Sequence, residues 1–269
     1  KSSYALGHAR VTENVTIEDC EVSGFDVGSM LDGTRRPDPK DHRNGRIKFG
    51  TESSGGFRNC VVRNCTFIDS MGFTLQMVDG GIIENIEASN LKMSNVKNYA
   101  LYIVTGKRNR TPDLKTVSTM KDVRISGVEA DGVDAMSGIQ IFGMPEQPIE
   151  NLSLSDIRIR SKGGGTAADA GRSPKDLGTQ YPDPSGKPGM PAYGIFARHV
   201  KGLKLANMDF SLAATDMRPV AQFENISGLV VENFRGQVGE GVPFAKIGPN
   251  VTGIQVTGSP ELEKCLPTH

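Results

Sequence analysis

The hydrophobic and polar positions of the chain repeat in a unit of nine residues. In each unit two apolar residues alternate with polar ones, a single Asn, Asp or Gly follows, and further apolar residues come after it. This alternation is typical of β-strands, whose side chains point to opposite faces in turn. The eight units are NVTIEDCEV at 14, NCVVRNCTF at 59, NIEASNLKM at 85, DVRISGVEA at 122, NLSLSDIRI at 151, GLKLANMDF at 202, GLVVENFRG at 228 and GIQVTGSPE at 253.

One position of the unit holds only residues that tolerate a left-handed backbone. Gly, Asn and Asp adopt a positive φ more readily than other residues. We therefore expect a corner at this position in every unit, and we expect the apolar residues that follow the corners to form one interior ladder. The corner residues are Asp19, Asn64, Asn90, Gly127, Asp156, Asn207, Asn233 and Gly258.

The spacing of the units predicts a solenoid. Successive units start 45, 26, 37, 29, 51, 26 and 25 residues apart, so the shortest steps define the coil and the longer ones carry insertions. We predict an all-β fold, a right-handed parallel β-helix of about eight coils, because each coil has to stack on its neighbours to bury its apolar face. A β-sandwich is the alternative, but it gives no reason for a recurring corner. Residues 1–269 are expected to form a single domain whose N-terminal coils lie upstream.

A second family of short strands lies between the units. Alternation places Ile47, Leu75, Ile103 and Ile139 of these strands inside the solenoid. Neighbouring coils lie about 4.8 Å apart, so the outward side chains are expected to form a continuous polar stripe. The outward residues are Arg46, Lys48, Thr74, Gln76, Tyr102, Gln140 and Arg198.

Composition removes several classes of function. The chain has 31 basic and 31 acidic residues, so its charge indicates neither nucleic acid nor an anionic membrane as a partner. No apolar run is long enough to cross a membrane. Four cysteines without a C-x-x-C pair argue against zinc, and no metal or cofactor is expected. Cys20 and Cys65 occupy one ladder position, where buried thiols are favoured over a disulfide.

The outward stripe suits an extended polymer that is rich in hydroxyl groups and partly anionic. A uronic acid offers a carboxylate that Arg46 can bind in a bidentate manner and that Lys48 can attract as a point charge. The alternative is an ordinary solvated sheet face, on which Lys and Arg are common.

Longer motifs resemble a known family. GRIKFGTESSGGFRNCVVRNCTF, VDGG, GGGT with the YPDP that follows it, PAYGIFARHVKGLKLANMDFS and the opening KSSYALGHARVTENVTIEDCEVSGFDVGSMLDGT are similar to the polygalacturonase-like glycoside hydrolases of family 28, particularly their bacterial branch. The resemblance implies hydrolysis of galacturonic-acid-containing pectic polysaccharide with inversion, and an extracellular or periplasmic location. It also implies that Arg46 and Lys48 hold the substrate carboxylate at the cleavage point, in a groove with Gln76, Tyr102, Gln140 and Arg198.

The sequence departs from the family's pattern at the catalytic carboxylates. They lie in an N-T-D element and a D-D pair, and this sequence contains neither. In the family the D-D pair comes a few residues before a Lys-Ser that aligns with Lys1 and Ser2. The resemblance therefore implies that the family's catalytic Asp residues would precede Lys1.

Within the chain, three carboxylates are the candidates for acid and base. Where the family has a Gly-His-Gly strand, Ser23 stands at the position of the His. The candidates are Asp26, Asp32 and Glu52, each of which has a solvated or turn-capping role as its alternative. Asp79 is expected to be a turn residue.

Two insertions and three histidines complete the candidates. Residues 30–44 lead into the R-I-K strand, and residues 163–191 are rich in Gly and Pro and would wall off the groove, favouring attack at chain ends. His199 is expected to be structural and to point away from Arg198, and His8 and His42 lie in loops near the groove.

Two other functions remain open. A non-catalytic saccharide-binding β-helix would use the same groove without carboxylates. A pectate-lyase-like enzyme would need acidic calcium ligands, for which no strand face offers a carboxylate cluster.

Overall fold

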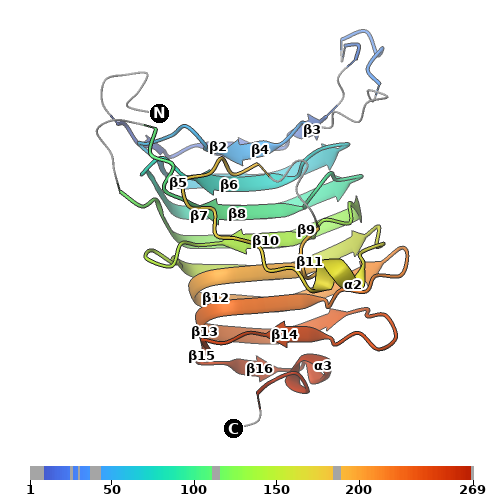
Figure 1. Ribbon diagram of the computed structural model, residues 1–269. Coiled ribbons are helices and arrows are strands. Elements are labelled where there is room, and N and C mark those ends of the chain that lie inside the picture. Colours follow the sequence, from blue (N-terminus) through green and yellow to red (C-terminus); the bar gives the residue numbers. More distant parts are fainter. Residues whose placement is uncertain are drawn as a thin grey trace.

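The nine-residue units form one wall of the molecule, which we call the long-strand wall, and its neighbouring strands are parallel (Figure 1). The computed structural model describes residues 9–24, 27–29, 31–36, 44–110, 116–183 and 189–267. The strands of this wall are β1 (Thr12–Glu13), β2 (Thr16–Glu18), β3 (Glu21–Ser23), β5 (Phe57–Ile68), β7 (Ile82–Ser94), β9 (Thr119–Val133), β11 (Ile149–Ser161), most of β12 (Ile195–Leu212) and of β13 (Ala221–Gly236), β15 (Val251–Thr252) and β16 (Gln255–Thr257).

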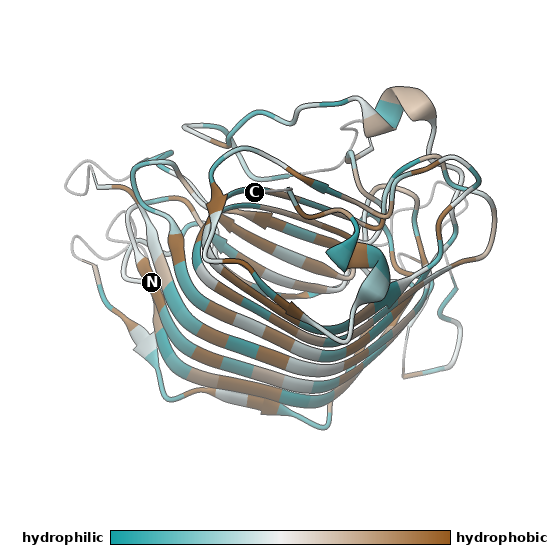
Figure 2. Cartoon of the chain, turned by 90° about the horizontal axis from the view of Figure 1, so that it is seen from below, coloured by the Kyte–Doolittle hydropathy of each residue, from teal (hydrophilic) through white to brown (hydrophobic). Residues whose placement is uncertain are grey.

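The second family of strands forms a second parallel wall, the short-strand wall. It consists of β4 (Ile47–Phe49), β6 (Phe73–Met77), β8 (Leu101–Thr105), β10 (Ile139–Phe142), the first residues of β12 and β13, and β14 (Ala245–Ile247). Because β12 and β13 pass from this wall into the other without a break, both walls belong to one continuous sheet. Seen from below, the sheet curls into a half-barrel (Figure 2). The predicted parallel β-helix is confirmed.

The corners have the backbone that the sequence predicts. All eight corner residues have a positive φ, between 51° at Asn233 and 63° at Gly127. The first residue of every unit also has a positive φ, which was not predicted from the sequence. These residues are Asn14, Asn59, Asn85, Asp122, Asn151, Gly202, Gly228 and Gly253. Each coil therefore bends twice on this wall, at positions five residues apart.

The corner amides also bind to one another along the stack. The Nδ2 atom of Asn90 donates to Oδ1 of Asn64 at 2.8 Å, and Nδ2 of Asn233 donates to Oδ1 of Asn207 at 3.0 Å. Asn207 in turn donates to Asp156 at 2.8 Å. Asn and Asp therefore do two things at a corner, since they tolerate the left-handed backbone and hold the next coil.

The residues after the corners fill the interior, with one exception. The buried members of the ladder are Cys65, Leu91, Val128, Ile157, Met208 and Phe234. Cys20 is exposed, so the expectation of two buried thiols is wrong for this residue. The reason is its place on the first coil, which packs against a neighbour on one side only among the described residues. All four cysteines are free.

The outer face of the long-strand wall carries charges of alternating sign in register. Arg58, Glu84, Lys121, Glu150 and Lys201 occupy one position on five successive strands. Glu84 lies 3.1 Å from Nε of Arg58 and 2.8 Å from Nζ of Lys121. Such exposed pairs each contribute little to stability, but they favour the observed pairing of strands over one that sets like charges together.

A long segment covers the short-strand wall. We call its described residues, 163–183 and 189–191, the roof. It contains α2 (Ala167–Ala170), whose capping box is formed by Thr166 and Asp169. The roof contacts the wall at several points, including a hydrogen bond of 3.3 Å from Nε2 of Gln76 to the carbonyl oxygen of Pro182 and one from Nζ of Lys246 to the carbonyl oxygen of Ala170.

A buried ion pair fixes the roof at its base. Arg218 and Asp216 are both fully buried, and Arg218 donates from Nε to one carboxylate oxygen at 2.9 Å and from Nη2 to the other at 2.7 Å. Nη1 of Arg218 donates to the carbonyl oxygens of Met136 at 2.7 Å and Met190 at 3.2 Å. Gly165 donates its backbone N–H to Asp216 at 2.9 Å. The ion pair therefore joins two coils to both ends of the roof.

The last coil ends in a short helix, α3 (Pro260–Glu263), whose Leu262 is buried in the core. In the described part of the chain, no helix has the length and apolar character needed to cross a membrane.

Candidate functional site

Arg46 and Lys48 lie side by side on the outer face of the short-strand wall. Lys48 is in β4 between Ile47 and Phe49, which are both buried in the core, so alternation turns Lys48 and Arg46 outward. Nη1 of Arg46 lies 3.3 Å from the thioether sulfur of Met71, which is a weak acceptor. Among the residues that the structure describes, neither cation forms an ion pair with a carboxylate.

Tyr181 of the roof lies against Lys48 and a third cation, Arg108. Nζ of Lys48 is 5.8 Å from the centre of the Tyr181 ring, and Cζ of Arg108 is 5.3 Å from it. Burial, followed by the positive charge of Arg46, lowers the pKa of Lys48 below its usual value. The lowered pKa means that the charged form of Lys48 is less stable here than in water, and an anion bound beside it would reverse that effect.

The nearby carboxylates belong to different arrangements. Asp79 is only 2% exposed and binds Arg108 with both oxygens, one of them 2.9 Å from Nε. Asp79 lies in the bend that follows β6, as the sequence predicts, and its side chain is in addition the buried partner of a guanidinium. Glu52 is exposed and forms an ion pair with Arg110, with Arg108 at 3.9 Å. Asp79 and Glu52 therefore share the cation Arg108, with Asp79 on its buried side and Glu52 on its exposed side.

Asp183 is a roof carboxylate in the neighbourhood of Lys48. Its charge acts on Lys48, Tyr99 and Tyr102. Tyr99 and Tyr102 pack with ring centres 4.7 Å apart, and burial raises the pKa of both hydroxyls. The site therefore combines two cations, stacked tyrosines and a carboxylate that comes from the roof.

Asp32, another candidate for acid or base, lies in the insertion before β4. It is in an exposed turn, where one of its oxygens accepts from the backbone N–H of Thr34 at 2.9 Å and from its hydroxyl at 2.6 Å. These bonds lower the pKa of Asp32, which suits a turn-capping carboxylate.

Several positions named from the sequence lie outside the described residues, namely Lys1, His8, Asp26 and His42. Asp26 is therefore not placed relative to the cation pair. The implication that the family's catalytic Asp residues would precede Lys1 likewise stays a prediction. Of the three candidates for acid and base within the chain, only Asp32 and Glu52 have described surroundings.

The rest of the outward stripe lies beneath the roof. Lys48, Thr74, Tyr102 and Gln140 share one position on successive strands, and Gln76 and Arg198 share the neighbouring outward position. Gln76, Tyr102, Gln140 and Arg198 are at most 7% exposed. The sequence predicts the outward direction and the alignment of these side chains correctly. The roof covers them, since Leu177 and Met190 lie at Tyr102 and Gln140, Pro182 binds Gln76 and Asp176 binds Arg198.

His199 departs from its expected direction. Oδ1 of Asp176 lies 3.1 Å from Nη1 of Arg198 and also 3.1 Å from Nε2 of His199. Strict alternation would separate these neighbours, but His199 occupies a corner with a φ of 56°, aligned with Asn225. The left-handed backbone turns both side chains toward the roof, where they hold Asp176. Arg198 also binds Glu224 at 2.6 Å.

Four site residues were missed from the sequence: Arg108, Asp176, Tyr181 and Asp183. Tyr181 and Asp183 belong to the YPDP segment, which the sequence marks only as a motif after a Gly-rich stretch. No periodicity extends through the roof, so the sequence held no signal for its contacts. Among the described residues, no three His, Cys, Asp or Glu side chains gather as a metal site would require.

Comparisons with family models, with curated proteins and with solved structures find no match to this chain. A function for the site has to be argued from its residues and from the motifs of the sequence.

Proposed function

We propose that this protein is a glycoside hydrolase that acts on galacturonic-acid-containing pectic polysaccharide, with Arg46 and Lys48 holding a substrate carboxylate. The observation that carries the proposal is the pair of adjacent, partly buried cations, neither of which forms an ion pair with a carboxylate in the described part of the chain. Keeping two like charges together costs free energy, and a bound anion offsets that cost. A uronic acid supplies an anion at each sugar of the polymer.

The neighbouring side chains suit a sugar as well as its carboxylate. The Tyr181 ring offers an apolar face beside Lys48. Hydrolysis with inversion needs one carboxyl as acid and one carboxylate as base, about 6.5–9.5 Å apart. Asp26, Asp32 and Glu52 remain the candidates from the sequence, and the position of Asp183 near Lys48 adds a fourth.

A non-catalytic saccharide-binding protein is the second candidate. It is favoured by the engagement of two candidate carboxylates, since Asp32 caps its own turn and Glu52 binds Arg110. Both functions use the same cation pair, so they differ only in whether bonds of the polymer are cleaved.

The test measures binding and cleavage separately. Polygalacturonate is offered to the protein and to the double variant Arg46→Gln/Lys48→Gln, with the exposed Lys204→Gln of the long-strand wall as control. Affinity is measured by calorimetry and cleavage by the release of reducing ends. We expect the double variant to lose most of its affinity, and we expect fully methyl-esterified pectin, which lacks the charge, to bind weakly to every form.

The outcomes separate the alternatives. Release of reducing ends by the unmodified protein supports the hydrolase, and tight binding without release supports the saccharide-binding protein. Equal affinity of the double variant and the control for polygalacturonate would remove Arg46 and Lys48 from the site and overturn both.

A further inference from the structure

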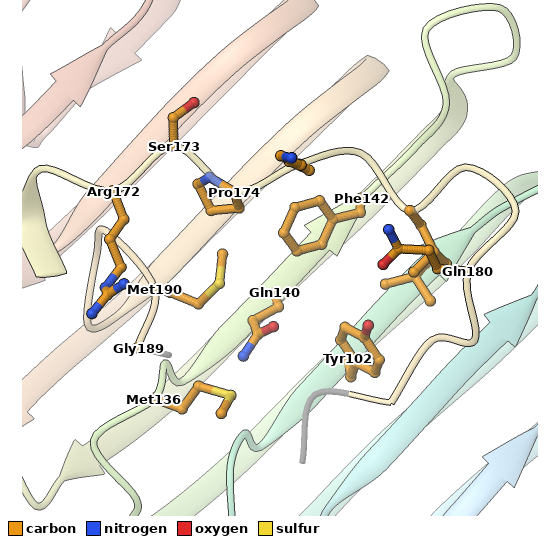
Figure 3. Close-up of a pocket in the computed structure, with 13 residues that line it drawn as sticks. Tyr102, Met136, Gln140, Phe142, Arg172, Ser173, Pro174, Gln180, Gly189 and Met190 are labelled. Atoms are coloured by element: carbon orange, nitrogen blue, oxygen red, sulfur yellow. The ribbon is translucent and has the colours of Figure 1, made fainter. Parts of the chain in front are cut away.

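Between the roof and the short-strand wall lies a cavity of about 410 Å³. Figure 3 shows side chains from both sides converging on it. Tyr102, Gln140 and Phe142 come from β8 and β10, and Leu177 and Met190 come from the roof. Aromatic, aliphatic and thioether groups therefore form most of its lining. A volume of this size falls within the range of small-molecule sites in proteins.

The buried end of the cavity contains an amide without a partner. Gln140 is 2% exposed, and its Nε2 atom makes no hydrogen bond in the structure. A buried N–H that lacks an acceptor costs free energy, so such groups are normally satisfied in a functional state. Gln140 lines the cavity (Figure 3), and an acceptor on a bound molecule would satisfy its side chain.

The charged residues of the lining are all cations. Arg172 and Lys175 of the roof are at the cavity, and no acidic residue is among its described lining residues. Arg172 is partly neutralised by Asp169 at 2.8 Å, whereas Lys175 has no ion-pair partner among the described residues. An anionic group at this position would gain a cation, and a cationic group would be repelled by Lys175.

This chemistry differs from that of a bare sugar. A sugar carries hydroxyl groups around its ring, and each would need a partner when buried. The cavity offers one buried amide between Met136, Met190 and Phe142. Methionine sulfur and aromatic rings pack well against an aromatic ring.

We propose that the cavity beneath the roof binds a small aromatic carboxylate, with its ring among Met136, Met190 and Phe142. An oxygen of the ligand accepts from Nε2 of Gln140, and the carboxylate lies at Lys175. The cavity borders the proposed saccharide site at Tyr102, but its unpaired amide, Gln140, is three strands along the wall from Lys48, a separation of about 14 Å.

The test uses 4-hydroxycinnamate as the probe, with calorimetry on the full chain. Three comparison molecules test the charge and the ring: 4-hydroxycinnamyl alcohol lacks the charge, tyramine carries a positive charge in its place, and 3-cyclohexylpropanoate keeps the carboxylate and its spacing without an aromatic ring. We expect 4-hydroxycinnamate to bind more tightly than all three. Because the chain contains no Trp, quenching of tryptophan emission is not an available readout, and the absorbance of the bound probe provides the second measurement.

Variants assign the contacts. Gln140→Leu keeps the size of the side chain and removes the unpaired amide, so it is expected to fold and to bind the probe about tenfold more weakly. Lys175→Gln should weaken the binding of 4-hydroxycinnamate and leave the affinity for 4-hydroxycinnamyl alcohol unchanged. Lys204→Gln serves as the control.

Three results would overturn the proposal. They are no heat or absorbance change at millimolar probe, equal affinity for the carboxylate and for tyramine, and unchanged affinity in Gln140→Leu. The variant Arg46→Gln/Lys48→Gln separates this site from the saccharide site. It should bind the probe normally, and a loss there would place the carboxylate at the cation pair and also count against the cavity.

Discussion

At the scale of single residues, the corner positions combine backbone and side-chain roles. Asn207 has a φ of 53°, donates to Asp156 and accepts from Asn233. Gly127 and Gly258 have the same left-handed backbone at other corners, but they have no side chain to bind a neighbouring coil. The backbone and side-chain contributions of a corner residue can therefore be separated. His199 shows the same backbone serving the site, since its left-handed corner allows it to reach Asp176 beside Arg198.

Replacing Asn207 should measure the two contributions. Asn207→Gly keeps an easy left-handed backbone and loses two hydrogen bonds, for an expected destabilisation of about 1 kcal/mol. Asn207→Ala loses the same hydrogen bonds and also places in the left-handed region a residue that tolerates it less well than Asn or Gly, so it should lose about 2 kcal/mol or more. Urea unfolding gives both values. Equal stability of the two variants would contradict a backbone role for this residue.

Lys48 makes a prediction about pH. Its pKa is lowered by burial and then by Arg46, so it loses its proton at a lower pH than an exposed lysine. Affinity for polygalacturonate should therefore fall as pH rises through this lowered pKa, because the site loses one of its two charges. Calorimetry between pH 7 and pH 10 measures the decline. Lys48→Arg, which stays protonated, should keep its affinity across this range, and a parallel decline in that variant would exclude Lys48 as the cause.

At the scale of elements, the roof depends on side-chain bonds more than on regular structure. Its single helix, α2, has four residues, too few to be stable alone. Oδ2 of Asp169 accepts from the hydroxyl of Thr166 at 2.7 Å and from its N–H at 2.9 Å, and Oδ1 accepts from Arg172 at 2.8 Å. These bonds lower the pKa of Asp169 to about 2.

Acid should loosen α2 before it affects the walls. The folded pKa of Asp169 lies below its ordinary value, so its stabilisation is complete above pH 4 and is lost as pH falls toward 2. The protection factors for hydrogen exchange, which are corrected for the intrinsic pH dependence, are expected to fall at residues 167–171 over this interval, while those in β11 stay high. In Asp169→Asn the protection of residues 167–171 should be low already at pH 5 and should change little on acidification. A steep acid response in that variant would assign the effect to another group.

The sequence predicted the walls well and the roof poorly, for a physical reason. Corners and alternation are local properties, so Asn64 or Ile103 could be placed from a few neighbouring residues. Glu52 binds Arg110, 58 residues further along the chain, and Gln76 binds Pro182 across 106 residues. Such contacts depend on the path of a Gly- and Pro-rich segment that has no periodicity. The outward direction of Gln140 was therefore predictable, and its burial was not.

At the scale of the whole molecule, one buried ion pair connects the roof to the coils. Burial alone would raise the pKa of Asp216, but the hydrogen bonds and charge of Arg218 prevail and lower it. Gly165 fits against this pair, and a β-carbon there would lie 2.0 Å from Nε of Arg218 and 2.5 Å from Oδ1 of Asp216. The absence of a side chain at Gly165 is what allows the pair to close.

Gly165→Ala should therefore separate Arg218 from Asp216. We expect a loss of about 3 kcal/mol, the range observed when a buried pair is broken, together with faster proteolysis of the roof. Gly171→Ala is the matched control, since its β-carbon would meet its nearest neighbour at 3.6 Å. Thermal unfolding and limited trypsin digestion measure both effects. A fully stable Gly165→Ala protein would show that the pair is not a tie for the roof.

The regular pairing of the strands has a consequence for how the two proposed sites are spaced. Phe57 pairs with Ile83, 26 residues on, and Lys48 with Thr74, also 26 residues on. Excising residues 57–82 would remove one full turn and leave the remaining strands paired in the same register. It would also bring Tyr102 directly beside Lys48. The distance between the cation pair and the cavity can thus change only in whole increments of about 4.8 Å. Insertion or loss of one turn would therefore change by that increment the length of a ligand that could reach both sites.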